Sequence, residues 1–346
     1  IDKLAETTDG QTNPGLVVTE ENAGSAPETV AAFTRDAIQS HHRYRTAETV
    51  AEEAGYRVHG WKNGRGIIGA LAAVGAWGTL EDWTYEHITY REPDRWGTDR
   101  IVDFESVFEA ADDFYPAVWD TVDRGTGETV CVPRTPGPVL FGIRGDDRSA
   151  CRSAAERIES EPVDRTRTFV TNQGTDGHLR PGTVGNTQDG HAYRLDGSVV
   201  SPPDTRRGGH VFFDFSDSEA TIECAAFEPT KRFRSKVRTL RAGDRLTVCG
   251  EVTEGTLKLE KFAVRELVRT ELRTPICPGC DRTMKSAGKA QGYRCRDCET
   301  TAEGKVEHSI DRDLEIGWYE VPPRARRHIA KPLIRGGFDA EIHPER

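Results

Sequence analysis

The chain of 346 residues is long enough for two or three domains of about 150 residues each, and this length excludes a single small binding module. Hydrophobic residues make up 36% of the chain, which is enough for buried cores, but the longest apolar run, residues 67–77, is much shorter than the roughly 18 residues of a membrane span. Asp and Glu (57) outnumber Lys and Arg (47), which gives a net charge of -10, and most of the basic residues are Arg, a composition typical of salt-adapted proteins. Salt at 1 M screens the field of surface charges within about 3 Å, so the negative charge does not exclude a nucleic-acid partner.

The first part of the chain, residues 1–58, combines a short strand with two helices. A turn at residues 13–15 precedes an apolar strand at 16–18, and helical patterns cover residues 27–41 and 46–54. The chain does not begin with Met and shows no cationic leader. We therefore expect a cytoplasmic protein that lacks its natural start.

Three glycines, Gly64, Gly66 and Gly69, have the spacing of a dinucleotide-binding turn and open a helix of small residues at 70–76. The strand before them is short and polar, so a nicotinamide-dependent enzyme is the weaker interpretation. A glycine turn at the start of a helix can hold a phosphate with its backbone amides, and Arg65 would add charge. The same glycines can instead serve only the close packing of the helix.

The next stretch alternates strands and a helix. Strands are expected at residues 83–91, 139–145 and 166–171, with a helix at 150–159. This order predicts an α+β layer of ferredoxin-like type. A polar loop with glycines follows at residues 171–178, and it is either part of a site or a plain linker.

From residue 182 the pattern changes to short strands at regular spacing. Three strands, one helix and two strands are the order of an OB-fold, a barrel that commonly binds single-stranded nucleic acid. The expected strands are 192–200, 208–215, 220–227, 245–250 and 256–264, and the helix begins at Pro229. Phe213 is either a base-stacking platform or a core residue, and the basic cluster at 231–241 is a candidate for phosphate contacts.

Two Cys-x-x-Cys pairs follow the expected barrel: Cys277 with Cys280, and Cys295 with Cys298. Two such turns can hold one Zn²⁺ with four thiolates and leave no open position, so they predict a structural zinc site. The other four cysteines are scattered, and we expect them to be reduced core residues.

Several segments along the chain resemble those of one enzyme family. They are Thr12-Asn-Pro-Gly-Leu-Val-Val18, Asn63-Gly-Arg-Gly66, Phe141-Gly-Ile-Arg-Gly145, residues 171–178, Glu228-Pro-Thr-Lys231, the four clustered cysteines and Pro322-Pro-Arg-Ala-Arg-Arg-His328. In this order they resemble the archaeal tRNA-Ile 2-agmatinylcytidine synthetase family. The resemblance implies an ATP-dependent ligase that joins agmatine to C2 of the wobble cytidine in a CAU anticodon, so that this tRNA-Ile decodes AUA.

The resemblance adds a kinase-like domain to the parts expected from the residues alone. The expected fold class is therefore multidomain α+β, with a kinase-like and ferredoxin-like α+β part, then an OB-fold β-barrel, then a zinc ribbon. The expected parts are the remainder of an ATP-binding kinase-like domain (1–58), a ferredoxin-like domain (59–180), an OB-fold (181–270), a zinc ribbon (271–305) and a basic C-terminal segment (306–346).

The resemblance also implies cofactors, partners and residue roles. ATP, Mg²⁺ and a structural Zn²⁺ are the expected cofactors; tRNA-Ile with a CAU anticodon and agmatine are the expected partners, with no membrane and no obligate protein partner. Asn63, Gly64, Arg65, Gly66 and Arg144 would bind the nucleotide. Asn172, Gln173 and Asp176 would line a pocket for base or agmatine, with Asp176 facing the guanidinium. Phe213, Lys231, Arg232, Arg234, Lys236, Arg324, Arg326, Arg327 and Lys331 would contact the tRNA.

One family feature is absent from this sequence. Family members begin with an aspartate-rich strand and loop of the form Asp-Asp-Thr-Asp-Ser, which resembles a Mg-ATP ligand set. The nearest pair here, Asp146-Asp147, lies in a different context. We therefore expect this chain to bind tRNA without modifying it. The alternative function is a non-catalytic RNA-binding protein in which the barrel and the zinc ribbon do all the binding.

Overall fold

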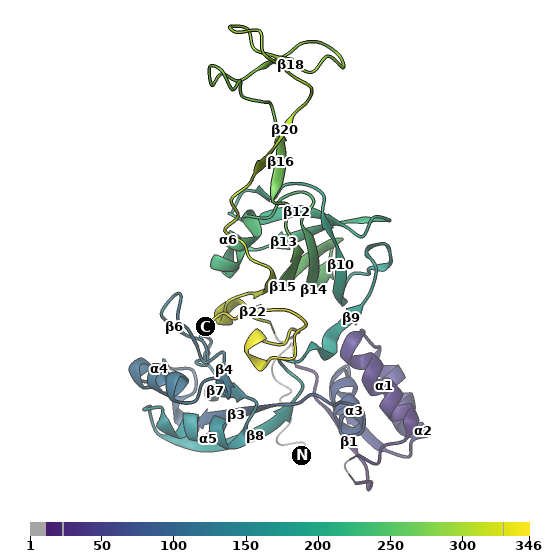
Figure 1. Ribbon diagram of the computed structural model, residues 1–346. Helices are drawn as coiled ribbons and strands as arrows, with labels where there is room; N and C mark the ends of the chain where they lie inside the picture. The colour runs from purple at the N-terminus through teal and green to yellow at the C-terminus, as the bar shows by residue number, and fades with distance from the viewer. Residues whose placement is uncertain (1–11, 23, 328) are drawn as a thin grey trace.

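A computed structural model describes residues 12–22, 24–327 and 329–346, so the start of the expected kinase-like part and the last residue of the motif at 322–328 lie outside the described residues. The first unit, drawn in purple in Figure 1, packs three helices against a two-stranded antiparallel ribbon. Its elements are β1 (Gly15–Val18), α1 (Glu28–Gln39), α2 (Tyr44–Glu53), β2 (Arg57–Gly60) and α3 (Gly66–Ala76). The strand and both helices expected before residue 58 are therefore present.

Helix α3 packs within this first unit, although the sequence suggested that it belongs to the second domain. Its Ile67 and Leu71 are buried in one core with Phe33 of α1. The two helices approach closely because Gly75 has no side chain; a Cβ there would lie 2.2 Å from Oγ1 of Thr34. This packing groups α3 with α1 and α2 in the structure.

The second unit is ferredoxin-like, as expected. Its sheet has the strand order β4-β7-β3-β8, with β3 antiparallel to both neighbours, and a separate hairpin of β5 and β6 lies beside it. The elements are β3 (Thr84–Arg91), α4 (Phe104–Asp113), β4 (Val118–Trp119), β5 (Val122–Asp123), β6 (Glu128–Thr129), β7 (Val139–Gly145), α5 (Arg148–Arg157) and β8 (Val163–Thr171). Helix α4, which the sequence analysis missed, starts where Asp103 accepts a hydrogen bond from the amide of Glu105.

The third unit is a closed barrel with the strand and helix order of an OB-fold, which confirms that expectation. Strand β10 pairs with β12 and β14, and parallel pairing of β13 with β15 completes the barrel. The elements are β9 (Leu179–Pro181), β10 (Ala192–Val199), β11 (Asp204–Thr205), β12 (Val211–Ser216), β13 (Thr221–Ala226), α6 (Arg232–Arg238), β14 (Arg245–Thr253) and β15 (Thr256–Glu266).

Helix α6 begins at Arg232 and not at Pro229, where the sequence suggested its start. Pro229 lies in a 3₁₀ turn, Glu228–Thr230, and Lys231 after it adopts a φ of 43°. This left-handed backbone separates the turn from the helix, because an α-helix needs negative φ at each residue.

The zinc ribbon stands away from the barrel on a two-stranded stalk, as Figure 1 shows. The stalk pairs β16 (Thr270–Arg273) with β20 (Val306–Ser309) in antiparallel register. The ribbon itself contains β17 (Lys285–Ser286), β18 (Tyr293–Arg294) and β19 (Thr301–Ala302). Its small core is formed by cysteines with Met284 and Tyr293, so its folding depends on its own contacts.

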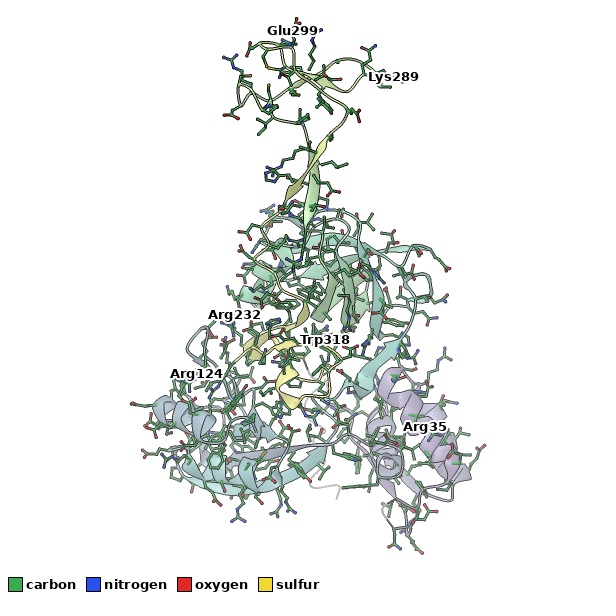
Figure 2. All side chains as sticks on the ribbon, viewed as in Figure 1. Arg35, Arg124, Arg232, Lys289, Glu299 and Trp318 are labelled. Atoms are coloured by element: carbon green, nitrogen blue, oxygen red, sulfur yellow. The ribbon has the colours of Figure 1, made fainter. Side chains whose placement is uncertain are left out.

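The C-terminal segment returns from the stalk and joins the barrel to the ferredoxin-like unit. Its strands β21 (Gly317–Glu320) and β22 (Ile342–His343) extend the barrel sheet from β15. In Figure 2, Trp318 and Arg232 lie on the side of the barrel that faces the lower units. The buried Arg326 pairs with Glu320 of the barrel sheet and with Asp120 of the ferredoxin-like unit, 2.8 Å from its Nε.

Replacing Arg326 with Met tests this junction. The side chains of Asp120 and Glu320 are 6% and 1% exposed, so the variant leaves two buried carboxylates without their cation, and we expect the free energy of unfolding to fall by about 3–5 kcal/mol. Urea unfolding of the zinc-loaded chain measures the change. Arg245→Met is the control, because Arg245 pairs with Glu266 on the exposed barrel surface and should cost less than about 1 kcal/mol. Equal losses in the two variants would contradict this role for Arg326.

The loss of stability in Arg326→Met, relative to wild type, should be smaller in acid. Burial raises the pKa of Asp120 above its ordinary value, and Arg326 only partly offsets this rise. Without Arg326 the folded chain holds a proton on this carboxyl more tightly than the unfolded chain does, so lowering the pH favours the folded state. We expect the stability deficit of Arg326→Met to narrow as the pH falls from about 7.5 to about 5, measured as the difference from wild type at each pH. A constant or growing deficit would show that these carboxylates do not carry the effect.

Candidate functional site

A basic pocket of about 770 Å³ lies beside the glycine turn that precedes α3. It is formed by the segment that enters α2 and by the turn between β2 and α3. The charged residues of its lining are Arg43, Arg45, Glu48, Lys62 and Arg65. The ring of Tyr44 lies against Gly64 at the pocket wall, where a Cβ would be 3.5 Å from the ring. An excess of cations next to an aromatic ring suits a phosphorylated nucleotide.

The backbone amides of the glycine turn do not serve this pocket. The amide of Gly64 donates to the carbonyl of Trp61 at 3.1 Å, and the amide of Gly66 donates to the carbonyl of Asn13 at 2.8 Å. Neither is free to hold a phosphate, contrary to the expectation. Gly66 is required for packing, because a Cβ there would lie 2.4 Å from the backbone nitrogen of Gly15. Arg65 is exposed, and its charged side chain is the remaining candidate in this turn for contact with a phosphate.

The side chain of Asn63 supports the turn. Its Oδ1 accepts a hydrogen bond from the amide of Arg65 at 3.1 Å. The side chain of Asn63 therefore fixes the backbone from which Arg65 extends, although the residue also belongs to the pocket lining.

The sequence analysis missed the other half of the pocket. Arg43, Tyr44 and Arg45 lie 19 to 21 positions before Gly64, in a segment that the sequence pattern marks only as the gap between two helices. The run of cations around an aromatic residue was the available signal. Tertiary packing of α2 against α3 is what places this run beside Arg65.

The loop at residues 171–178 lies where the units meet, so it is more than a linker. Gln39 of α1 donates to the carbonyl of Gly177 at 3.0 Å, and His178 contacts the carbonyl of Ile38 at 2.7 Å. Arg335 of the C-terminal segment donates to the carbonyl of Gly174 at 2.7 Å. The loop therefore contacts the first unit and the C-terminal segment at once.

Asp176 of this loop is already paired. Its carboxylate accepts hydrogen bonds from Nζ of Lys261 at 2.5 and 2.8 Å and from the amide of Lys331 at 2.9 Å. Lys261 is a barrel residue whose side chain is only 1% exposed, so Asp176 neutralises a buried charge. This structural role contradicts the expectation that Asp176 faces the guanidinium of agmatine.

Asn172 and Gln173 hold the start of the loop through their main chain. The carbonyl of Asn172 accepts from Oγ1 of Thr175, and the carbonyl of Gln173 accepts from Oγ1 of Thr84, each at 2.7 Å. Oε1 of Gln173 is buried and finds no hydrogen-bond partner among the residues that the structure describes.

Arg144 lies apart from the basic pocket. It is a residue of β7, and its Nε donates to Oε1 of Glu86 on β3 at 3.1 Å. The two line a hollow of about 430 Å³ on the ferredoxin-like sheet, which shares no lining residue with the pocket beside Arg65. The structure thus does not bring Arg144 together with the other residues expected to bind the nucleotide.

Phe213 is a core residue, which contradicts its expected role in RNA stacking. Its side chain is 3% exposed within the barrel core. Successive residues of a strand point to opposite faces, so Phe212 carries the outward position. The guanidinium of Arg206 lies over the Phe212 ring, 4.0 Å from its centroid.

Most cations expected to contact tRNA are instead paired within the chain. Lys231 pairs with Glu228, Arg232 with Asp123 and Glu345, Arg234 with the carbonyl of Gly209, Arg324 with Glu128, Arg326 with Asp120 and Glu320, and Arg327 with Glu251 and Glu260, while Lys331 lies 4.0 Å from Asp82. Lys236 is exposed, with its Nζ 5.9 Å from the centroid of the Tyr319 ring. Where these cations meet buried carboxylates they stabilise the junctions between units, because a buried carboxylate needs a cation beside it.

The four clustered cysteines form the expected metal site. The Sγ atoms of Cys277, Cys280, Cys295 and Cys298 all lie within 4.8 Å of one another. Four thiolates fit a structural Zn²⁺ with no open position. The four scattered cysteines are all buried and free, as expected.

Family models match three regions of the chain: a TiaS FLD domain at residues 64–178, an OB-fold nucleic acid binding domain at 193–267 and a TiaS C-terminal zinc ribbon domain at 274–314. A protein of Haloquadratum walsbyi, named as the 2-agmatinylcytidine synthetase TiaS of an isoleucine tRNA, is 54% identical over 100% of this chain and 84% of its own length. The chain belongs to the TiaS family. A TiaS of Methanosarcina mazei is 47% identical over 100% of this chain and 82% of its own length.

Solved TiaS structures have the same fold. Apo TiaS superimposes with a TM-score of 0.85 and 43% identity, covering 99% of this chain and 82% of that one. The TiaS complex with its isoleucine tRNA and ATP gives a TM-score of 0.87, and the complex with the same tRNA, AMPCPP and agmatine gives 0.85. Among the described residues of this TiaS family member, no helix is long and apolar enough to cross a bilayer.

Replacing Cys295 with Ser tests the metal site. Cys295 is 2% exposed inside the ribbon core, and a site with three thiolates binds Zn²⁺ much more weakly. We expect bound zinc, measured by mass spectrometry of the purified chain, to fall from one ion per chain to a small fraction of that. Limited proteolysis should then cleave within the ribbon while the barrel stays protected. Ser286→Ala, an exposed ribbon residue, is the control that should keep its zinc; unchanged zinc in Cys295→Ser would overturn the assignment.

Proposed function

We propose that this chain is an ATP-dependent ligase that conjugates agmatine to C2 of the wobble cytidine of tRNA-Ile with a CAU anticodon. One observation carries the proposal: 99% of the chain superimposes on TiaS crystallised with its isoleucine tRNA, AMPCPP and agmatine, at 41% identity. The expectation of a binding protein that does not modify tRNA rested on the absence of one segment. The full set of matching units favours the enzyme.

The chemistry of the target carbon explains the need for ATP. C2 of cytidine carries a carbonyl oxygen, which is a poor leaving group. Transfer of the γ-phosphoryl group of ATP to this oxygen releases ADP and makes the oxygen part of a phosphate leaving group. The primary amine of agmatine then forms the new bond to C2, loses a proton, and phosphate leaves. Cations and Mg²⁺ must stabilise the charge on the phosphoryl group during transfer.

The basic pocket is the part of this chain that fits a nucleotide. Arg65 and the side chains of Arg43 and Arg45 would contact the phosphates, with Mg²⁺ neutralising the remaining charge. Asn172 and Gln173, both half-buried at the junction of the units, would line the pocket for base or agmatine. In this arrangement the first unit would bind ATP, and the loop at the end of the ferredoxin-like unit would bind the base or agmatine.

The tRNA backbone would be held by cations that the fold leaves exposed. Lys236 on the barrel and Lys285, Lys289 and Arg296 on the ribbon are exposed candidates; Figure 2 shows Lys289 at the outer end of the ribbon. A tRNA substrate also favours a cytoplasmic location.

Transfer of labelled agmatine to unmodified CAU tRNA-Ile, with ATP and Mg²⁺ at high KCl, tests the proposal. Label in the RNA that requires ATP supports the ligase. Binding of tRNA without transfer would favour the alternative, a non-catalytic RNA-binding protein. Neither binding nor transfer would contradict both functions.

Replacing Arg65 with Ala tests the nucleotide pocket. Loss of one charged contact to a phosphate should raise the KM for ATP by about tenfold or more, because such a contact contributes about 1.5–3 kcal/mol. Steady-state transfer at varied ATP measures the effect. The matched control is Arg35→Ala on α1 of the same unit, whose partner Glu28 is exposed and which lies outside the pocket lining. An unchanged KM in Arg65→Ala would place the ATP phosphates elsewhere.

A further inference from the structure

Among the described residues, helices α4 and α5 pack on one face of the ferredoxin-like sheet, and residues 130–139 border the other face near β7. Phe141 and Ile143 of β7 belong to the core beneath α4 and α5. The alternate residues of the same strands face the opposite side, because side chains of a strand alternate between faces. The pairing of Glu86 on β3 with Arg144 on β7 marks this second face, which we call the open face.

The edge strand β8 contributes an aromatic ring and two arginines to the open face. In the register of β8 with β3, Phe169 stands opposite Glu86, Arg167 opposite Ile88, and Arg165 opposite Tyr90. Phe169 is 45% exposed, and both arginines are exposed as well. An exposed aromatic ring offers a flat apolar surface that a partner can cover.

The two arginines differ in their partners. The guanidinium of Arg165 lies 4.8 Å from the centroid of the Tyr90 ring and pairs with Asp164. Arg167 donates a hydrogen bond to the carbonyl of Thr166 at 3.3 Å, and the described part of the chain gives it no carboxylate. On a chain with a net charge of -10, this cation two residues from an exposed ring points to an anionic partner that also offers flat apolar surfaces.

We infer that the open face binds an unpaired stretch of RNA. This inference rests on the proposed function, in which the RNA substrate is a tRNA. Unpaired bases stack on aromatic rings and their phosphates pair with arginine, so Phe169 takes a base and Arg167 a phosphate. A four-stranded sheet with one uncovered face is a known geometry for this kind of binding. A paired RNA helix does not fit, because its bases are stacked inside the helix and do not reach the ring.

Two substitutions on the zinc-loaded full chain test the inference, with binding of CAU tRNA-Ile followed by fluorescence anisotropy. Phe169→Ala should weaken binding about tenfold, and Phe169→Trp should retain it, since base stacking on an aromatic ring tolerates a change of ring. Arg167→Ala should reduce the slope of log Kd against log salt by about 0.7, the value for one phosphate contact to a single strand. A fully paired RNA duplex should bind wild type and Phe169→Ala equally.

Matched controls lie on the other face of the same unit. Val170→Ala removes a 39% exposed apolar side chain from the helix face of β8, and Arg152→Ala removes a cation from α5. Both should bind tRNA with the affinity and salt slope of wild type. If Phe169→Ala and Arg167→Ala also behave as wild type while wild type binds tRNA, the inference fails and the proposed function stands. If wild type does not bind tRNA, both fail.

Discussion

The arrangement of the units depends on one constraint: a buried charge must have a partner of opposite sign beside it. Arg326 satisfies two buried carboxylates, Asp120 of the ferredoxin-like unit and Glu320 of the barrel sheet. Lys261, buried on the outer side of barrel strand β15 against the C-terminal segment, is paired in turn with Asp176 of the loop at residues 171–178. These pairs join separate parts of the chain. Separating the barrel from the ferredoxin-like unit or from the C-terminal segment would therefore leave buried charges without a partner.

This constraint also decides which cations are available for a ligand. The basic residues of the C-terminal segment neutralise carboxylates of other units, as Arg327 does for Glu251 and Glu260. A chain rich in acid uses much of its arginine in this way. The cations left exposed, such as Arg65 beside the pocket and Arg167 on the open face, are therefore more informative about ligands than the long basic runs in the sequence.

The two ends of the molecule differ in how they are held. The first unit contacts the junction through Gln39 and Ile38, which bond to the loop at residues 171–178. The ribbon is joined to the barrel by the stalk of β16 and β20 and folds around its own cysteines. A nucleotide in the basic pocket would thus lie in a unit that contacts the loop at residues 171–178, whereas the ribbon is joined to the barrel through the stalk.

Features that depend on neighbours along the chain could be predicted from the sequence. Cysteine spacing predicted the zinc site, and alternating and helical patterns predicted the strands of the ferredoxin-like sheet and of the barrel. Tertiary structure alone decided that Phe213 is buried while Phe212 faces outward, because a strand pattern does not say which parity meets the core. It also decided that Asp176 pairs with Lys261, 85 residues away, and Arg326 with Asp120, 206 residues away. Charge partners at such separations are set by how the units pack, and no local pattern encodes them.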